Sequence, residues 1–281
     1  MAAEGGWDRV RAAVAPARDG PQYTAGPPVD RLHGFVVGTR LDSGRHLNSE
    51  FPMGRDVIIA TPAGPVNAWR ADPPYGAAAL GAVVVIQEIF GVNAHIRSVA
   101  DGYAAAGYVV LAPALFDPVA RNVELAYDDD GFARGRELVE ALGTERALGI
   151  LRACRDVLQA EGHRGIGVVG FCWGGTLAFL ANTRLGLPAV SYYGARTVPF
   201  LDEPLQAPML FHFGIDDPSI SGEDIERHRT CQPDAELQVH PGGHGFNRDV
   251  DPRHYHADSA AAARRATLAF LDAALRQDAT P

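Results

Sequence analysis

From residue 54 onward, short runs of β-branched and aliphatic residues alternate with longer stretches in which apolar residues recur every three or four positions. The first pattern is typical of strands and the second of amphipathic helices. The pattern predicts strands at residues 57–61, 66–70, 81–87, 108–112, 165–170, 189–193, 208–213 and 237–240. It predicts helices at residues 96–106, 173–184, 221–231 and 257–276, and one or two helices within 132–161.

This alternation indicates an α/β protein whose central sheet is mostly parallel and carries helices on both faces. The continuous apolar run at Gly81–Gln87 is typical of a strand buried on both sides. The two strands that flank the turn Pro62–Pro65 predict an antiparallel hairpin at the start. In parallel sheets the chemistry lies beyond the carboxyl ends of the strands, so the loops that follow strands are the candidate sites.

The first 52 residues differ from the rest of the chain. They mix Gly, Pro, Arg and Asp without a sustained period, and residues 19–30 have the composition of a linker. Met53 directly precedes the first strand pattern. We interpret residues 1–52 as a weakly ordered extension or an incorrectly assigned start, and residues 53–281 as the folded domain.

Composition narrows the class of protein. The chain has 281 residues, 47% hydrophobic and 21% charged, which suits one globular domain. A net charge of −9 without a Lys/Arg cluster argues against a nucleic-acid partner. No stretch reaches the ~18 apolar residues of a membrane span, and no signal-peptide pattern begins the chain. Three cysteines without CxxC spacing fit a reducing compartment. We expect a cytoplasmic monomer or homodimer without a membrane partner.

One predicted strand runs into the following helix with almost no loop, at GFCWGG, residues 170–175. A nucleophile on so sharp a turn needs small residues two positions before and after it, which Gly170 and Gly174 provide for Cys172. The amide of Trp173 would face the same space at a helix N-terminus, where it can bind developing negative charge. The alternative is a buried cysteine without chemistry, since free cysteine packs as a small hydrophobe.

Two later loops offer partners for such a nucleophile. After one strand come the adjacent acids Asp216 and Asp217, of which only one can face a histidine, the other fitting a turn. After the last strand, His244 lies between glycines in PGGHGFNR at 241–248. The order nucleophile, acid, histidine is that of α/β-hydrolases. His244 would take the thiol proton and return it to the leaving group.

The other histidines have weaker claims to chemistry. His212 and His240 lie in predicted strands and fit core or rim positions. His254 and His256 form an HxH pair without a third ligand motif, so we expect no metal ion.

Glu88 follows the strand at 81–87, and an acid at the end of a strand buried on both faces needs a partner. Near a thiol it could hold the thiol protonated or accept its proton. The backbone amide of Ile89 lies where this fold contributes its second oxyanion donor. The alternative for Glu88 is a salt bridge to an arginine such as Arg97.

With these loops assembled, residues 54–276 or so resemble the dienelactone hydrolase family (carboxymethylenebutenolidases), which implies the α/β-hydrolase fold. The likeness is carried by QEIFGVNAHIR at 87–97, GYVVLAPALF at 107–116, GFCWGG at 170–175, SYYG at 191–194, FHFGIDD at 211–217 and PGGHGFNR at 241–248. Cysteine as the nucleophile, with QEIFG upstream, is specific to this family within the larger fold. General esterases and lipases carry serine at that position.

The resemblance implies a role for each matching residue. Cys172 is similar to the family's nucleophile, and Asp217, rather than Asp216, completes the triad with His244. Glu88 is similar to the acid that keeps the thiol quiet until substrate binds and then helps to form the thiolate.

The resemblance also implies the groups that hold the substrate. The amides of Ile89 and Trp173 would form the oxyanion hole. Arg248 is similar to a family arginine that holds a substrate carboxylate, and such a pair can be bidentate and orient a lactone. No cofactor is implied.

The region that supplies the family's second substrate arginine and its tyrosine departs from the pattern. Here it reads YDDDGFARGREL at 127–138. Counting without gaps places an aspartate in the arginine's position and Phe132 in the tyrosine's. Arg134 or Arg136 would substitute if the helix is shifted. The three acids Asp128–Asp130 would oppose a nearby anionic substrate, or simply begin a solvated helix.

These features favour a hydrolase that opens a small lactone or enol-lactone through a thioester. An esterase or thioesterase for neutral or bulkier substrates is the alternative that the altered arginine region suggests. A non-catalytic binding domain of the same fold is a third possibility, against which the complete set of acid, thiol and histidine stands. A cysteine peptidase fits least, because its cysteine does not normally lie on a turn of this kind.

Overall fold

The computed structural model describes residues 54–74 and 77–276, which form an eight-stranded sheet of order β1-β2-β4-β3-β5-β6-β7-β8. β1 pairs with β2 and β2 with β4 in antiparallel fashion, and all other neighbours are parallel. The strands are β1 (Gly54–Thr61), β2 (Gly64–Ala71), β3 (Gly81–Ile86), β4 (Tyr108–Pro113), β5 (Ile166–Phe171), β6 (Ala189–Tyr192), β7 (Met209–Gly214) and β8 (Glu236–His240). The predicted α/β-hydrolase fold is confirmed.

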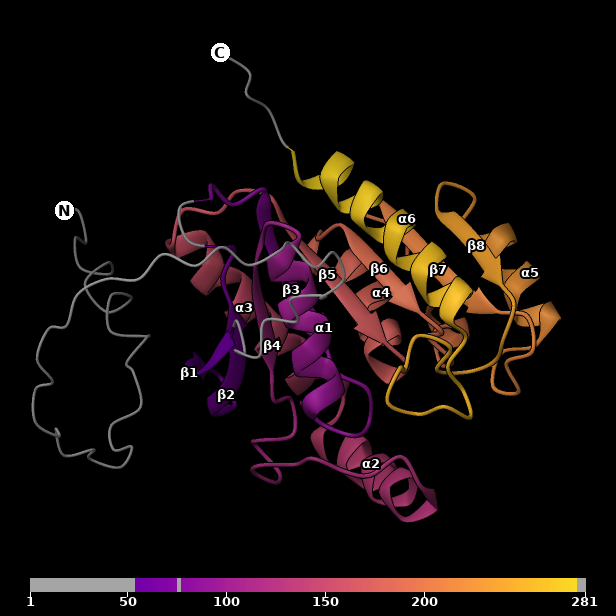
Figure 1. Ribbon diagram of the computed structural model, residues 1–281, viewed down its shortest axis with the longest axis horizontal. Coiled ribbons are helices and arrows are strands. Elements are labelled where there is room, and N and C mark those ends of the chain that lie inside the picture. Colours follow the sequence, from indigo (N-terminus) through magenta and orange to yellow (C-terminus); the bar gives the residue numbers. More distant parts are fainter. Residues whose placement is uncertain (1–53, 75–76, 277–281) are drawn as a thin grey trace, which may run out of the picture.

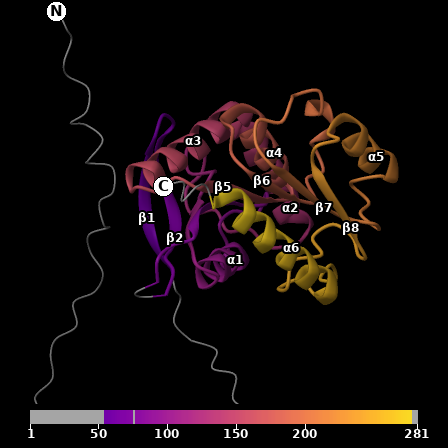
Figure 2. The same ribbon diagram turned by 90° about the horizontal axis from the view of Figure 1, so that it is seen from above.

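Helices cover both faces of this sheet (Figures 1 and 2). The helices are α1 (Ala94–Ala105), α2 (Asp129–Leu142), α3 (Thr144–Ala160), α4 (Trp173–Leu185), α5 (Gly222–Cys231) and α6 (Ala257–Leu275). Figure 2 shows α1 and α6 on one face and α3 and α4 on the other. A short 3-10 turn, η2 (Val198–Phe200), was not predicted.

Local sequence sets where the helices begin and end. Asn93 starts α1 because its side-chain oxygen accepts the amide of Ile96 at 3.2 Å. The predicted helical region at 132–161 is two helices, separated at Gly143, whose φ of 75° the helix cannot continue. In the described ranges 54–74 and 77–276, no helix combines the length and apolarity that crossing a bilayer requires. The prediction for residues 1–52 falls outside these ranges.

A series of buried hydrogen bonds links strands β6, β7 and β8 to helix α6. His212 Nδ1 lies 3.0 Å from His240 Nε2, and His212 Nε2 lies 3.1 Å from Thr267 Oγ1. The hydroxyl of Tyr192 meets the same Thr267 oxygen at 2.7 Å. His212 and His240 are therefore core residues with partners, as the sequence predicts. Burial lowers the pKa of His212 to about 3.

This histidine predicts acid sensitivity. Because the folded pKa of His212 is about 3 and the ordinary value is 6.5, the unfolded chain binds a proton between these pH values that the folded chain does not. Stability should therefore fall with pH below 6.5, by about 2 kcal/mol from this group at pH 5. Urea unfolding at pH 7 and pH 5 measures the loss. His212→Asn should reduce it, and an equal loss in both proteins would contradict the assignment.

Candidate active site

Cys172 joins β5 to α4 in a strained backbone conformation, with φ 54° and ψ −119°. Residues other than glycine rarely adopt positive φ. A Cβ atom on Gly170 would overlap the carbonyl oxygen of Gly174, and one on Gly174 would overlap that of Gln87. Both glycines are therefore required by close backbone approach, and the turn presents the half-buried Cys172 side chain at the carboxyl end of β5.

His244 and Asp217 meet on the loops that follow β8 and β7. Nδ1 of His244 lies 2.8 Å from Asp217 Oδ2, while the amide of Ser219 donates to Asp217 Oδ1 at 2.8 Å. Asp216 is exposed. A proton on Nδ1 leaves Nε2 free for a thiol. Burial alone would lower the pKa of His244, but the negative charge of a Cys172 thiolate and the bond to Asp217 raise it to about 10, so His244 can hold the proton that the thiol releases.

The amides of Ile89 and Trp173 lie where sequence places an oxyanion hole, at the start of the β3–α1 loop and of α4. Gln87 shapes the first loop: its side chain accepts the amide of Leu115 at 3.0 Å and donates to the carbonyl of Glu88 at 3.1 Å. Among the hydrogen bonds of the described ranges, neither the Ile89 nor the Trp173 amide donates to a protein acceptor. Both donors remain available for a ligand oxygen.

Glu88 is fully buried and forms a bidentate ion pair with Arg248. Nη2 of Arg248 lies 2.8 Å from Oε1, and Nε lies 3.3 Å from Oε2. Burial would raise the pKa of Glu88, but the charge and hydrogen bonds of Arg248, together with the nearby His95 and His244, lower it overall. The alternative partner Arg97 is wrong, because Arg97 pairs with Glu124 at 2.7 Å. Glu88 and Arg248, for which the sequence predicts separate roles, therefore form an ion pair with each other.

The guanidinium of Arg248 is enclosed on several sides. Its carbon lies 4.3 Å from the ring centre of Tyr127 and 5.5 Å from that of Phe90. Gly245, with φ 80°, lies so close that a Cβ atom there would come 2.9 Å from Cζ of Arg248. Nη1 also donates to Asp251 Oδ2 at 3.2 Å. All three guanidinium nitrogens therefore already donate to carboxylates.

The structure does not bring the other predicted substrate residues to Arg248. The side chain of Arg134 is 53% exposed and pairs with Glu137 at 2.7 Å, and Phe132 is 50% exposed. Arg136 lies over the Phe132 ring, 6.0 Å from its centre. Helix α2 instead turns Gly135 toward the site, where a Cβ atom would overlap the carbonyl oxygen of Ile89. Arg134 is one residue before Gly135, and because a helix turns by about 100° per residue, its side chain points to solvent.

Three residues near the site were not predicted from sequence. Tyr127 and Asp251 contact Arg248, as described above. Tyr193 has φ 40°, is fully buried, and packs its ring 5.1 Å from the ring of His244. SYYG at 191–194 was a family motif and therefore a usable signal for Tyr193. An acid three residues after Arg248 carries no signal until the loop is folded.

The described residues contain no group of three His, Cys, Asp or Glu side chains that could hold a metal ion. The two histidines of the HxH pair, His254 and His256, make hydrogen bonds within the protein. His254 Nδ1 lies 2.7 Å from Asp251 Oδ2, and His256 Nδ1 accepts the amide of Ser259 at 3.3 Å, at the start of α6.

Comparison with known proteins identifies the family of the chain. Residues 68–275 match the model of the Dienelactone hydrolase family. A carboxymethylenebutenolidase of Pseudomonas putida is 33% identical over 204 residues, which are 67% of this chain and 84% of that protein. A Synechocystis sp. protein provisionally named a carboxymethylenebutenolidase is 33% identical over 198 residues, 64% of this chain and 80% of its own. A solved structure from Klebsiella pneumoniae subsp. pneumoniae, provisionally named a dienelactone hydrolase, shares 28% identity with a TM-score of 0.70 and covers 78% of this chain and 97% of its own.

Proposed function

Because the chain belongs to the dienelactone hydrolase family and is a hydrolase of carboxylic ester bonds, we propose that it opens a small lactone or enol-lactone by nucleophilic attack of Cys172. The observation that carries the proposal is the position of Cys172 on a strained strand–helix turn, within hydrogen-bond reach of the His244 that Asp217 orients. A nucleophile, a base within reach and a group that orients the base are the set that acyl transfer requires.

The proposed reaction has two halves. His244 takes the proton of the Cys172 thiol, and the thiolate adds to the lactone carbonyl. The amides of Ile89 and Trp173 hold the oxyanion. The ring C–O bond then breaks, and the released oxygen takes the proton from His244. This leaves the opened acid as a thioester on Cys172. Water, activated by His244, adds to the thioester carbonyl, and the thiol leaves as the carboxylic acid forms.

The ion pair with Arg248 bears on the role of Glu88. Since both Glu88 oxygens accept from Arg248, its carboxylate is held ionised and oriented to the guanidinium. We infer that Glu88 acts on the thiol only after Arg248 has been drawn away from it. In the geometry described here, Glu88 is the counter-ion of Arg248.

Neutral or bulkier esters are the second candidate substrates, and one observation favours them. The family-like arginine Arg248 is paired with two carboxylates, and Arg134 faces solvent. A lactone that bears a carboxylate therefore finds no unpaired cation at this position.

Hydrolysis of two substrates tests the proposal. Loss of ultraviolet absorbance follows the opening of a carboxylated dienelactone, and dye release follows cleavage of a neutral aryl ester. The wild type should turn over at least one of them, and Cys231→Ala, which alters an exposed cysteine, should behave as the wild type. Failure on both substrates, with Cys172 resistant to alkylation, would contradict catalysis and favour a binding domain.

A further inference from the structure

Asp251 is a buried acid that the proposed reaction does not use. It lies three residues after Arg248, and its Oδ2 accepts from Nη1 of Arg248 at 3.2 Å. The same carboxylate accepts from His254 Nδ1 at 2.7 Å and from Arg253 Nε at 3.3 Å. His254 and Arg253 are exposed, so water screens much of their charge. Of these three partners of Asp251, only Arg248 is buried.

Glu88, Arg248 and Asp251 form a buried group that we call the Arg248 cluster. It contains two carboxylates and one guanidinium. Burial would raise the pKa of Asp251, but its bonds to His254, Arg253 and Arg248 lower it, so both acids are ionised at neutral pH. The cluster then carries one excess negative charge. A further carboxylate placed there would meet two like charges and one shared cation.

The shape of the cluster leaves little room for such a carboxylate. Guanidinium binds carboxylates in its own plane, through pairs of N–H groups. Nε and Nη2 are used by Glu88, and Nη1 by Asp251. The ring of Tyr127 and the backbone of Gly245 lie against the guanidinium. These bonds engage three of the five guanidinium N–H groups, so a substrate carboxylate must compete with both acids for Arg248.

We propose that Asp251 is a positioning residue that keeps Arg248 on Glu88 and thereby makes the acyl site select uncharged lactones and esters over carboxylated ones. The inference rests on the proposed function and names the substrate class of the same site. Removing the charge of Asp251 frees one side of Arg248 for a substrate anion. This variant should therefore differ from the wild type in substrate selectivity and not in the rate of the chemical step.

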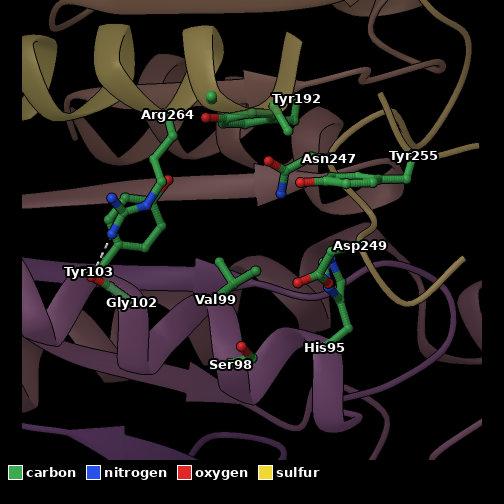
Figure 3. Close-up of a pocket in the computed structure, with 12 residues that line it drawn as sticks. His95, Ser98, Val99, Gly102, Tyr103, Tyr192, Asn247, Asp249, Tyr255 and Arg264 are labelled. Atoms are coloured by element: carbon green, nitrogen blue, oxygen red, sulfur yellow. Dashed lines mark hydrogen bonds and ion pairs between the residues drawn. The ribbon is translucent and has the colours of Figure 1, made fainter. Parts of the chain in front are cut away.

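A second acid on the same loop provides a matched control. Asp249 is 57% exposed, and its Oδ1 lies 3.0 Å from Nδ1 of His95. Figure 3 shows both residues on the wall of a separate cavity of about 330 Å³ between α1 and α6. The carboxylates of Asp249 and Asp251 thus have different partners although they are two positions apart. Asp249→Asn removes a charge from the loop at a side chain that pairs with His95 and not with Arg248.

The test compares kcat/KM for a carboxylated dienelactone and for its primary carboxamide, which has the same shape without the charge. The wild type should prefer the carboxamide. Asp251→Asn should shift the ratio toward the carboxylate about tenfold or more, chiefly through a lower KM for that substrate, as expected for one charge a few ångströms away. Asp249→Asn should leave the ratio unchanged. Arg253→Gln, at a side chain that is 70% exposed, should shift it the other way.

The outcomes distinguish failure of the inference about Asp251 from failure of the proposed function. A wild type that prefers the carboxylate, or an Asp251→Asn ratio equal to that of the wild type or of Asp249→Asn, would overturn the inference while leaving the cysteine mechanism intact. If Asp251→Asn does not fold, the wild-type preference and the direction of the Arg253→Gln shift still decide. If neither substrate is cleaved through Cys172, the proposed function itself fails.

Discussion

Replacing Cys172 by alanine should lower kcat/KM by about 10⁴-fold or more while leaving the protein folded. The Cys172 thiol is the proposed acyl carrier at the strand–helix turn, so without it the acyl group would have no carrier. The fold should persist because alanine is smaller and the Cys172 side chain is only half-buried. Initial rates on the better of the two substrates, with thermal unfolding of each variant, make the measurement.

The other two cysteines serve as controls for this variant. Cys231 is exposed, and Cys154 lies on the buried face of α3. Cys231→Ala should change neither rate nor stability. Cys154→Ala should cost stability through a small cavity but retain turnover at temperatures where it is folded. A Cys172→Ala protein with more than about a tenth of wild-type activity would show that the ester bond is broken without this thiol.

Arg248→Met should lower the free energy of unfolding by about 3–5 kcal/mol, the usual cost of leaving a buried charge without its partner. Methionine fills similar space but leaves Glu88 and Asp251 without the cation between them. In the wild type the pair stabilises the protein above the ordinary pKa of glutamate, and this contribution is lost as pH falls through the lowered pKa of Glu88. In the variant, burial without Arg248 raises that pKa. The stability difference should therefore shrink on acidification.

Urea unfolding of matched variants tests this prediction. Arg134→Met removes an exposed pair with Glu137 and should cost less than about 1 kcal/mol. Combining Glu88→Gln with Arg248→Met removes the strongest uncompensated charge, so the double variant should regain part of the loss. If Arg248→Met costs no more than Arg134→Met, the Arg248 cluster is not the buried ionic group that its distances indicate.

Local patterns sufficed to predict most of the fold. The all-apolar run at 81–87 and the glycines around Cys172 each carry their own physical reason, so the strand and the strand–helix turn could be read directly. Element ends shifted by a few residues, as at α1, where Asn93 caps the helix earlier than its apolar period suggests. The 3-10 turn η2 has no sustained period and could not be predicted.

Contacts between residues far apart in the sequence were harder to predict than the strand, helix or loop on which each residue lies. Glu88 needed a cation, and Arg97 was nearest in sequence, yet Arg248 is 160 positions away and reaches Glu88 through the loop after β8. The prediction for Arg134 and Phe132 depends on the rotation of a helix, which turns by about 100° per residue. The contact of Gly135 with Ile89 fixes that rotation, which only the folded structure contains.

The most direct test of the account is to find the acyl group during the first turnover. Wild-type protein is mixed with excess substrate, quenched in acid within the first turnover, and digested for peptide mass mapping. We expect the mass of the opened acyl group on the peptide that contains Cys172, its release by hydroxylamine, and its absence from Cys172→Ala. An acyl group on another residue, or product release in the first turnover without any acyl-protein, would contradict cysteine catalysis by this protein.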